Sequence, residues 1–166
     1  MIHIILYHPE MPMNTGNILR TAMATNSFVH IIGPLPFSLD DKSLKRAGMD
    51  YLKSAKYDYY PSYEEFNNVY KNKTIYFVTK YGTHVYSDVD FSNPSVDVYV
   101  MFGNESTVID KDILSKYKDF TLRIPMLSTA RSLNLSNSVA IVVYDILRQK
   151  KFPSLATFDM IHKYKI

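Results

Sequence analysis

The chain contains no cysteine, and only five of its 166 residues are glycine. Without cysteine there is no disulfide framework, no thiolate nucleophile and no cysteine-type zinc site. The five histidines are scattered without a pair at metal-ligand spacing, so we expect no metal centre. The few glycines form neither a Gly-x-Gly-x-x-Gly fingerprint nor a Walker loop. Their absence disfavours the ordinary Rossmann mode of cofactor binding.

Long hydrophobic runs are also missing. No stretch approaches the roughly 20 consecutive apolar residues that a membrane span needs, so we expect no membrane partner. The apolar start at residues 2–7 is short, lacks a basic leader and runs directly into polar residues. We expect a first core strand there and not a signal peptide. A cytoplasmic protein is expected, which suits the absence of cysteine.

Length and charge limit the number of domains and the class of binding partner. A chain of 166 residues is the size of one domain, and we expect a single domain over residues 1–166. The formal net charge is +3, which is mildly basic. This charge allows a polyanionic partner such as nucleic acid without demanding one.

Short apolar runs rich in β-branched and aromatic residues recur along the chain and predict strands at 2–7, 28–33, 74–79, 97–102 and 120–124. Helical patterns lie between several of them, and this alternation predicts an α/β fold with a parallel sheet. Asn14 is the expected N-cap of the first helix, and a second helix is expected after Asp40-Asp41. A third is expected from Ser62, where Glu65 gives capping-box spacing.

The last long helix is expected from about residue 136 to residue 149. Its apolar surface is wider than one stripe, so we expect it to pack on two sides. One of these sides is a candidate contact with a partner subunit, with Tyr144 at its edge.

Polar residues directly follow three of the expected strands, where ligands bind in open α/β sheets. In the first loop, residues 9–20, Asn14 and Arg20 at a helix start suit phosphate binding. In the second, residues 99–105, Gly103 permits a φ that often marks close ligand approach. The third, residues 124–137, holds more hydrogen-bonding side chains than one helix cap requires. Taken singly, each loop also has an ordinary structural explanation. The first fits a capped helix with a surface arginine, the second an ordinary turn, and the third a compact loop.

Together and in this order, the loops resemble the motifs of the SPOUT methyltransferase superfamily. The similar stretches are Asn14-Thr15-Gly16-Asn17-x-x-Arg20, Phe102-Gly103-x-Glu105, and Ile124-Pro125-Met126 with residues 131–137. Residues 40–51 also resemble the SpoU-type tRNA (cytidine/uridine) 2'-O-methyltransferases, which modify the wobble nucleotide. The likeness covers about residues 2–150.

The resemblance implies a parallel sheet flanked by helices, with a trefoil knot in the C-terminal half, and a homodimer. It implies S-adenosyl-L-methionine as methyl donor, S-adenosyl-L-homocysteine as product and the anticodon loop of tRNA as substrate. The implied cofactor residues are Val78, Gly103, Ile124, Met126, Ser132 and Leu133. The implied catalytic residues are Arg20, Asn14, Ser136 and Asn137. Substrate contacts are implied for Asn17, Glu105, Arg131, Lys45 and Arg46, with Arg131 supplied by the partner chain.

One loop departs from the superfamily pattern. After Glu105 the superfamily usually continues Thr-Arg-Gly-Leu-Pro, whereas this chain reads Ser106-Thr107-Val108-Ile109-Asp110. Because of this change, a first alternative is that the chain is a non-catalytic RNA-binding module that has lost cofactor binding. A 2'-O-methyltransferase acting on another tRNA or rRNA site is a second alternative, and a flavodoxin-like enzyme of small molecules is a third. The tail at residues 152–166 has no role that the sequence explains.

Overall fold

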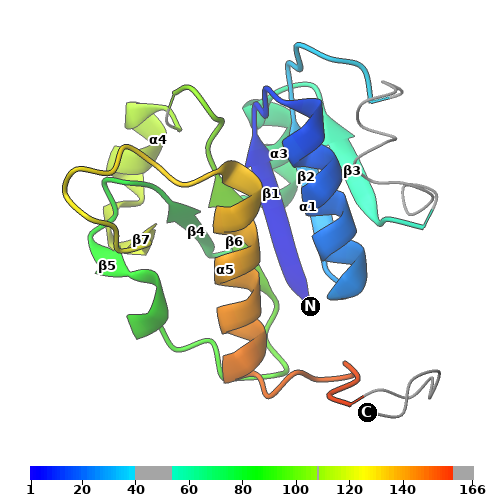
Figure 1. Cartoon of the computed structure of the whole chain (residues 1–166). Coiled ribbons are helices and arrows are strands. Elements are labelled where there is room, and N and C mark those ends of the chain that lie inside the picture. The colour runs from blue at the N-terminus through cyan, green and yellow to red at the C-terminus, as the bar shows by residue number, and fades with distance from the viewer. Residues whose placement is uncertain (40–53, 108, 159–166) are drawn as a thin grey trace.

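Parallel β-strands form the centre of the molecule (Figure 1). The structure is a computed structural model, and it describes residues 1–39, 54–107 and 109–158. Seven strands lie in one sheet in the order β3-β2-β1-β6-β4-β7-β5, and every neighbouring pair is parallel. The strands are β1 (Ile2–Tyr7), β2 (Phe28–Ile32), β3 (Tyr57–Tyr60), β4 (Ile75–Val78), β5 (His84–Val85), β6 (Val98–Phe102) and β7 (Thr121–Arg123).

Helices cover both faces of the sheet. Among the described residues, the α-helices are α1 (Pro12–Ala24), α3 (Tyr63–Tyr70), α4 (Lys111–Lys116) and α5 (Leu135–Gln149), and the short 3-10 helices are η2 (Tyr86–Asp88) and η3 (Lys118–Phe120). Within the described ranges, no helix has the length and apolar character needed to cross a membrane.

The predicted α/β fold with a parallel sheet is confirmed, and all five predicted strands are present. Two further strands, β3 and β5, were not predicted. Both lie at the edges of the sheet, where one neighbour is missing and side chains stay partly exposed. Tyr57–Tyr60 therefore carries no apolar run, and His84–Val85 is too short to show alternation.

Alternating side chains of β1 divide the core between the two faces of the sheet. Ile4 and Leu6 pack in the cluster that includes the buried residues of α1 and α5. Ile5 and Tyr7 pack in the other cluster, with α3 and α4. The first face carries α1 and α5 next to each other (Figure 1). At the upper edge of the view, the carboxyl ends of the central strands open toward the loops that hold the predicted motifs.

The expected start of the first helix was wrong. Helix α1 begins at Pro12, with Met11 in the N-cap position, and Asn14 lies inside the first turn, buried. Proline is favoured at the first helical position because its missing N–H has no helical partner there. Asn14 is thus released from capping and directs its side chain elsewhere.

The other two helix predictions that can be checked are confirmed. Helix α3 begins after Ser62, whose side chain accepts a 3.2 Å hydrogen bond from the N–H of Glu65. Helix α5 starts at Leu135, one residue before the expected start, and is capped by Asn134. The helix expected after Asp40-Asp41 lies outside the described residues.

Two histidines on the neighbouring strands β1 and β2 stack on each other. Nδ1 of His3 on β1 is 2.9 Å from Nε2 of His30 on β2, and the His30 side chain is completely buried. Nδ1 of His30 has no hydrogen-bond partner in the described part of the chain. At this buried position, an Nδ1 lone pair without a donor costs less free energy than an N–H without an acceptor. We therefore place the proton of His30 on Nε2. This N–H then donates to His3, whose own Nε2 faces Asp97 at 3.9 Å.

Burial and, to a smaller extent, the neighbouring His3 together lower the pKa of His30 from 6.5 to about 3. Below pH 6.5 the unfolded chain therefore takes up a proton at His30 that the folded chain refuses, so stability falls as the pH falls toward 3. Between pH 6.5 and pH 5 this residue is expected to remove roughly 2 kcal/mol from the free energy of unfolding. Urea unfolding of wild type and His30→Leu across this window checks the effect. Parallel curves for the two proteins would contradict it.

Candidate active site at the carboxyl edge of the sheet

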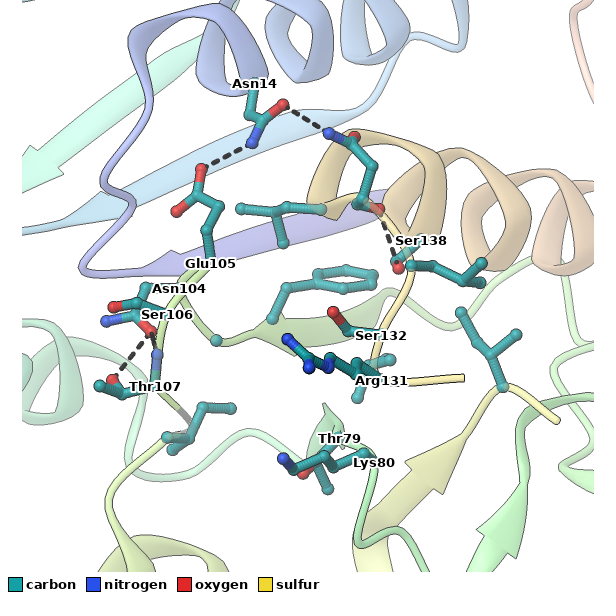
Figure 2. A pocket seen from close by; sticks show the side chains of 18 of the residues that line it. Asn14, Thr79, Lys80, Asn104, Glu105, Ser106, Thr107, Arg131, Ser132 and Ser138 are labelled. Carbon is teal, nitrogen blue, oxygen red and sulfur yellow. Dashed lines mark hydrogen bonds between the residues drawn. The ribbon is translucent and has the colours of Figure 1, made fainter. Parts of the chain in front are cut away.

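A cavity of about 680 Å³ opens where strands β4, β6 and β7 end. Val78 and Phe102 line it from the ends of β4 and β6, and Ile124 lines it just after β7. The loops after β4 and β6, the loop before α5 and the first turn of α1 supply further walls (Figure 2). The volume lies within the range of about 300–1,000 Å³ that is typical of small-ligand sites.

Most of the residues singled out from the sequence meet at this cavity. The structure places nine of them along its walls: Val78, Gly103, Ile124, Met126, Ser132, Leu133, Asn14, Glu105 and Arg131. Residues more than a hundred positions apart in the chain thus line one space, because parallel strands bring their carboxyl ends to the same edge. Apolar walls next to hydroxyl, amide and charged groups suit a ligand with a flat ring and a polar end.

A chain of hydrogen bonds joins the three predicted loops at the rim of the cavity. Nδ2 of Asn14 donates to Oε1 of Glu105 at 2.8 Å, and Oδ1 of Asn14 accepts from Nδ2 of Asn134 at 3.0 Å (Figure 2). Glu105 also accepts from the backbone N–H groups of Glu10 at 2.8 Å and Met11 at 3.2 Å. The carboxylate of Glu105 therefore fixes the loop after β1. The side-chain amide of Asn14 connects the first turn of α1 to the start of α5.

Asn134 completes this chain as the cap of α5. Its Oδ1 accepts from the backbone N–H of Ser136 at 2.9 Å and from that of Asn137 at 3.3 Å. The hydroxyl of Ser136 donates to the same oxygen at 2.7 Å. Ser136 and Asn137 thus lie next to the cavity at the helix start, while Ser138 is the residue of this turn that lines it.

The expected backbone freedom of Gly103 was wrong. No glycine in the described residues has a positive φ, so Gly103 is not required by a left-handed turn. It lines the cavity directly, and the lack of a side chain leaves space for a ligand at the end of β6.

The loop that departs from the superfamily pattern is held by its own polar contacts. The N–H and the hydroxyl of Thr107 donate to Oδ1 of Asn104 at 2.7 and 2.8 Å. The hydroxyl of Ser106 donates to the carboxylate of Glu10, next to the Glu105 contact. These bonds order the loop without the arginine and glycine that the superfamily usually places there.

Two cations line the cavity from separate segments. Arg131 lies before α5, and Lys80 follows β4; Figure 2 shows Lys80 across the cavity from Asn14 and Glu105. The guanidinium of Arg123 donates to the backbone carbonyl of Lys80 and holds this loop. Sequence reasoning missed Lys80, Asn104 and Ser138, although the position of Lys80 just after a predicted strand was a signal that could have found it.

Other predicted residues lie away from the cavity. Arg20 and Asn17 are exposed on α1 and are not among the residues that line it. Arg131, expected from a partner chain, lines the cavity of its own chain. Lys45 and Arg46 lie outside the described residues. Across the part of the chain that is described, no group of three or more His, Asp or Glu side chains is arranged to hold a metal.

Comparisons with known proteins agree with this geometry. Residues 1–144 match the model of the SpoU rRNA methylase family. The tRNA (cytidine(34)-2'-O)-methyltransferase of Escherichia coli is 38% identical over 96% of this chain and 100% of its own length. A structure solved for the 2-OH methylation of C/U34 on tRNA is 34% identical, with a TM-score of 0.83 over 91% of both chains.

A third protein shows the fold with a cofactor. The SpoU methyltransferase AviRb from Streptomyces viridochromogenes, solved in complex with AdoMet, is 25% identical with a TM-score of 0.77. The match covers 90% of this chain and 60% of AviRb. The family model spans far more than half of the residues and the Escherichia coli relative is aligned over its whole length. The chain belongs to the SpoU methylase family.

Proposed function

We propose that this methyltransferase uses S-adenosyl-L-methionine to methylate the ribose 2'-hydroxyl of the wobble nucleotide, cytidine or uridine 34, of tRNA. The observation that carries the proposal is the cavity whose rim joins three loops through Glu105, Asn14 and Asn134. Family membership and the substrate in the name of the Escherichia coli relative support the same reaction. We place this activity in the cytoplasm and in a single domain.

The residues around the cavity fit S-adenosyl-L-methionine. Val78, Ile124 and Leu133 offer apolar walls for an adenine ring, and Ser132 and backbone groups near Gly103 and Met126 offer hydrogen-bond partners. The cations Lys80 and Arg131 suit the carboxylate of the amino-acid part. When bound, the cofactor supplies an activated methyl group, and S-adenosyl-L-homocysteine is the product.

The work of the protein is then to position the ribose and to stabilise its oxygen. Guanidinium groups are poor general bases in proteins, so we do not assign that role to Arg20. Its guanidinium is suited to hold the phosphate next to the target and to stabilise charge that develops on the 2'-oxygen. Asn14 fixes the first turn of α1, the helix that carries Arg20, and Ser136 and Asn137 contribute the N-terminal turn of α5.

A homodimer completes this arrangement. Arg20 and Asn17 are exposed on α1 and are not among the residues that line the cavity of their own chain, which supports a dimer in which each subunit brings its Arg20 to the cavity of the other. Apolar side chains are exposed around the paired helices α1 and α5: Met11 and Met13 on one side, and Ile141 and Tyr144 on the other. A second copy of this chain is the partner that would cover them.

The substrate surface includes residues beyond the described ranges. Lys45 and Arg46 belong to a basic stretch that we assign to phosphate contacts with the anticodon stem-loop. We also assign contacts with the target nucleotide to Glu105 and Arg131, which line the cavity.

Nucleoside analysis of methylated RNA tests the proposal directly. Purified protein, labelled S-adenosyl-L-methionine and unmethylated bulk tRNA are expected to give 2'-O-methylcytidine or 2'-O-methyluridine at position 34 by mass spectrometry. A methyl group on a base, or on a ribose outside the anticodon loop, contradicts the assignment. Calorimetry that detects no binding of S-adenosyl-L-methionine would instead favour the non-catalytic RNA-binding module.

A further inference from the structure

A second cavity, of about 430 Å³, lies on the α3 and α4 face of the sheet. Tyr7 from the end of β1 and Tyr63 from the start of α3 line one part of it. Asp110, Lys111 and Lys116 line it from α4 and the residue before that helix, with Asp112 and Ile113. No residue of this cavity has a role in the proposed reaction, and the volume is ample for a single nucleobase.

The two cavities lie next to each other, because residues that are close in the sequence line one or the other. Ile109 lines the first cavity and Asp110 lines the second. On the other side, Tyr7 and Met11 are separated only by the short loop after β1, and they line the second and first cavities respectively. A ligand long enough to pass over this edge of the sheet would meet both cavities in turn.

The polar groups of this cavity are placed for hydrogen bonding to a ligand. The hydroxyl of Tyr7 donates to Oδ2 of Asp110 at 2.7 Å, which fixes the carboxylate. Asp110 is the N-cap residue of α4, yet its side chain makes no capping hydrogen bond. Within the described residues, Oδ1 of Asp110 accepts no hydrogen bond from the protein, and the ammonium groups of Lys111 and Lys116 form no ion pair.

The aromatic groups are suited to a flat ring. Tyr63 is half-buried, and its ring meets that of Tyr7 edge-on, with centroids 6.0 Å apart. Tyr7 in turn stacks on His8 at 4.0 Å. Unstacked bases of single-stranded RNA bind to surfaces of this kind, by contact with aromatic rings and by hydrogen bonds to their edges.

We propose that this second cavity binds a nucleotide next to the target in the same RNA loop, with its base against Tyr63 and its phosphates near Lys111 and Lys116. The inference rests on the proposed function, which brings a single-stranded loop to this edge of the sheet. Oδ1 of Asp110 accepts a hydrogen bond from an exocyclic amino group, so cytosine, adenine or guanine is bound in preference to uracil. Uracil presents carbonyl oxygens on both sides of its N–H, which repel the carboxylate.

Salt-dependent binding tests the phosphate contacts. The probe is a fluorescent anticodon stem-loop with cytidine at the wobble position, titrated with full-length protein in the presence of S-adenosyl-L-homocysteine. The double variant Lys111→Met, Lys116→Met is expected to reduce the slope of log K against log salt by about 1.4, which corresponds to two single-strand phosphate contacts. The matched control, Lys71→Met with Lys118→Met, removes two exposed lysines at the opposite edge of the sheet and is expected to leave the slope unchanged.

Base preference tests Asp110 separately. Stem-loops with uridine at each position next to the target are compared with the parent loop. At one position, uridine is expected to weaken wild-type binding by ~10–150-fold, the effect of one lost hydrogen bond to a charged group. Asp110→Asn, which keeps the shape of the side chain, is expected to abolish this preference. Equal slopes for the two double variants, or no uridine effect at any position, would overturn the proposal.

The two proposals fail in different ways. If the lysine and uridine effects appear but no ribose methyl is formed, the nucleotide site stands and the proposed reaction does not. If position 34 is methylated but binding ignores the lysines and Asp110, the reaction stands and the second site is wrong. A wild-type protein that does not bind the stem-loop at all contradicts the second site as well.

Discussion

Arg20→Ala is expected to lower kcat by a factor of about 10²–10³, the usual loss when one donor to a developing oxyanion is removed. Affinity for S-adenosyl-L-methionine should stay within a few-fold of wild type, because Arg20 does not line the cofactor cavity. Single-turnover methylation of a stem-loop and calorimetry with the cofactor measure the two quantities. Arg148→Ala is the matched control, since this exposed arginine lies at the far end of α5, where it pairs with Asp145. Unchanged turnover in Arg20→Ala would remove the residue from the mechanism.

The Arg20→Ala variant also tests whether each active site is shared between two subunits. Gly103→Leu places a side chain in the cofactor cavity and should inactivate the pocket of its own chain. If each cavity uses Arg20 of the second copy, mixing Arg20→Ala with Gly103→Leu subunits restores one intact site per mixed dimer, or about a quarter of wild-type activity for random pairing. No recovery in dimers shown to contain both variants would contradict the use of Arg20 across the interface, and a stable monomer by light scattering would contradict the dimer itself.

Glu105→Ala is expected to lower both the stability and the turnover of the enzyme. The change leaves Asn14 and two backbone N–H groups without their acceptor, at a cost of about 1–3 kcal/mol for each donor that stays buried. For a chain of this size each kcal/mol lowers Tm by about 2–4 °C. A loop displaced by even ~1 Å can reduce kcat by about 10²-fold.

Calorimetry and single-turnover kinetics separate these two effects of Glu105. Glu105→Gln keeps one acceptor oxygen and should fall between wild type and Glu105→Ala in both measurements. Glu64→Ala is the control, because Glu64 is an exposed acid in the first turn of α3. If Glu105→Ala retains wild-type Tm and kcat, the carboxylate does not hold the loop after β1.

Local patterns in the sequence predicted the buried strands and the polar loops at their ends, whereas the individual cofactor residues were implied by the family resemblance. A central strand of a parallel sheet is buried on both faces, so β1 and β6 stand out as apolar runs. Gly103 and Ile124 directly follow or end such runs, and parallel strands deliver their carboxyl ends to one edge. Position along the chain was therefore enough to bring these residues together.

Contacts between distant segments could not be predicted in this way. Asn14 matches a helix cap locally, but its partner Glu105 lies 91 residues away, and Pro12 is the better local signal for the start of α1. The contact between Tyr7 and Asp110 spans 103 residues and had no signature in either segment. The trefoil knot, implied only by the resemblance, stays a prediction, as do the roles of Lys45 and Arg46.

The hydrogen bonds through Asn14 have a thermodynamic consequence. Glu105 and Asn134 belong to loops that line the cofactor cavity, whereas the loop held between them leads to Arg20. In the proposed enzyme, a ligand that orders either end of this hydrogen-bond chain would lower the entropy cost of ordering the other, and the two binding equilibria would then be linked. Linkage is reciprocal: the factor by which bound cofactor raises RNA affinity equals the factor by which RNA raises cofactor affinity. An enzyme built this way holds its two substrates most tightly when both are present.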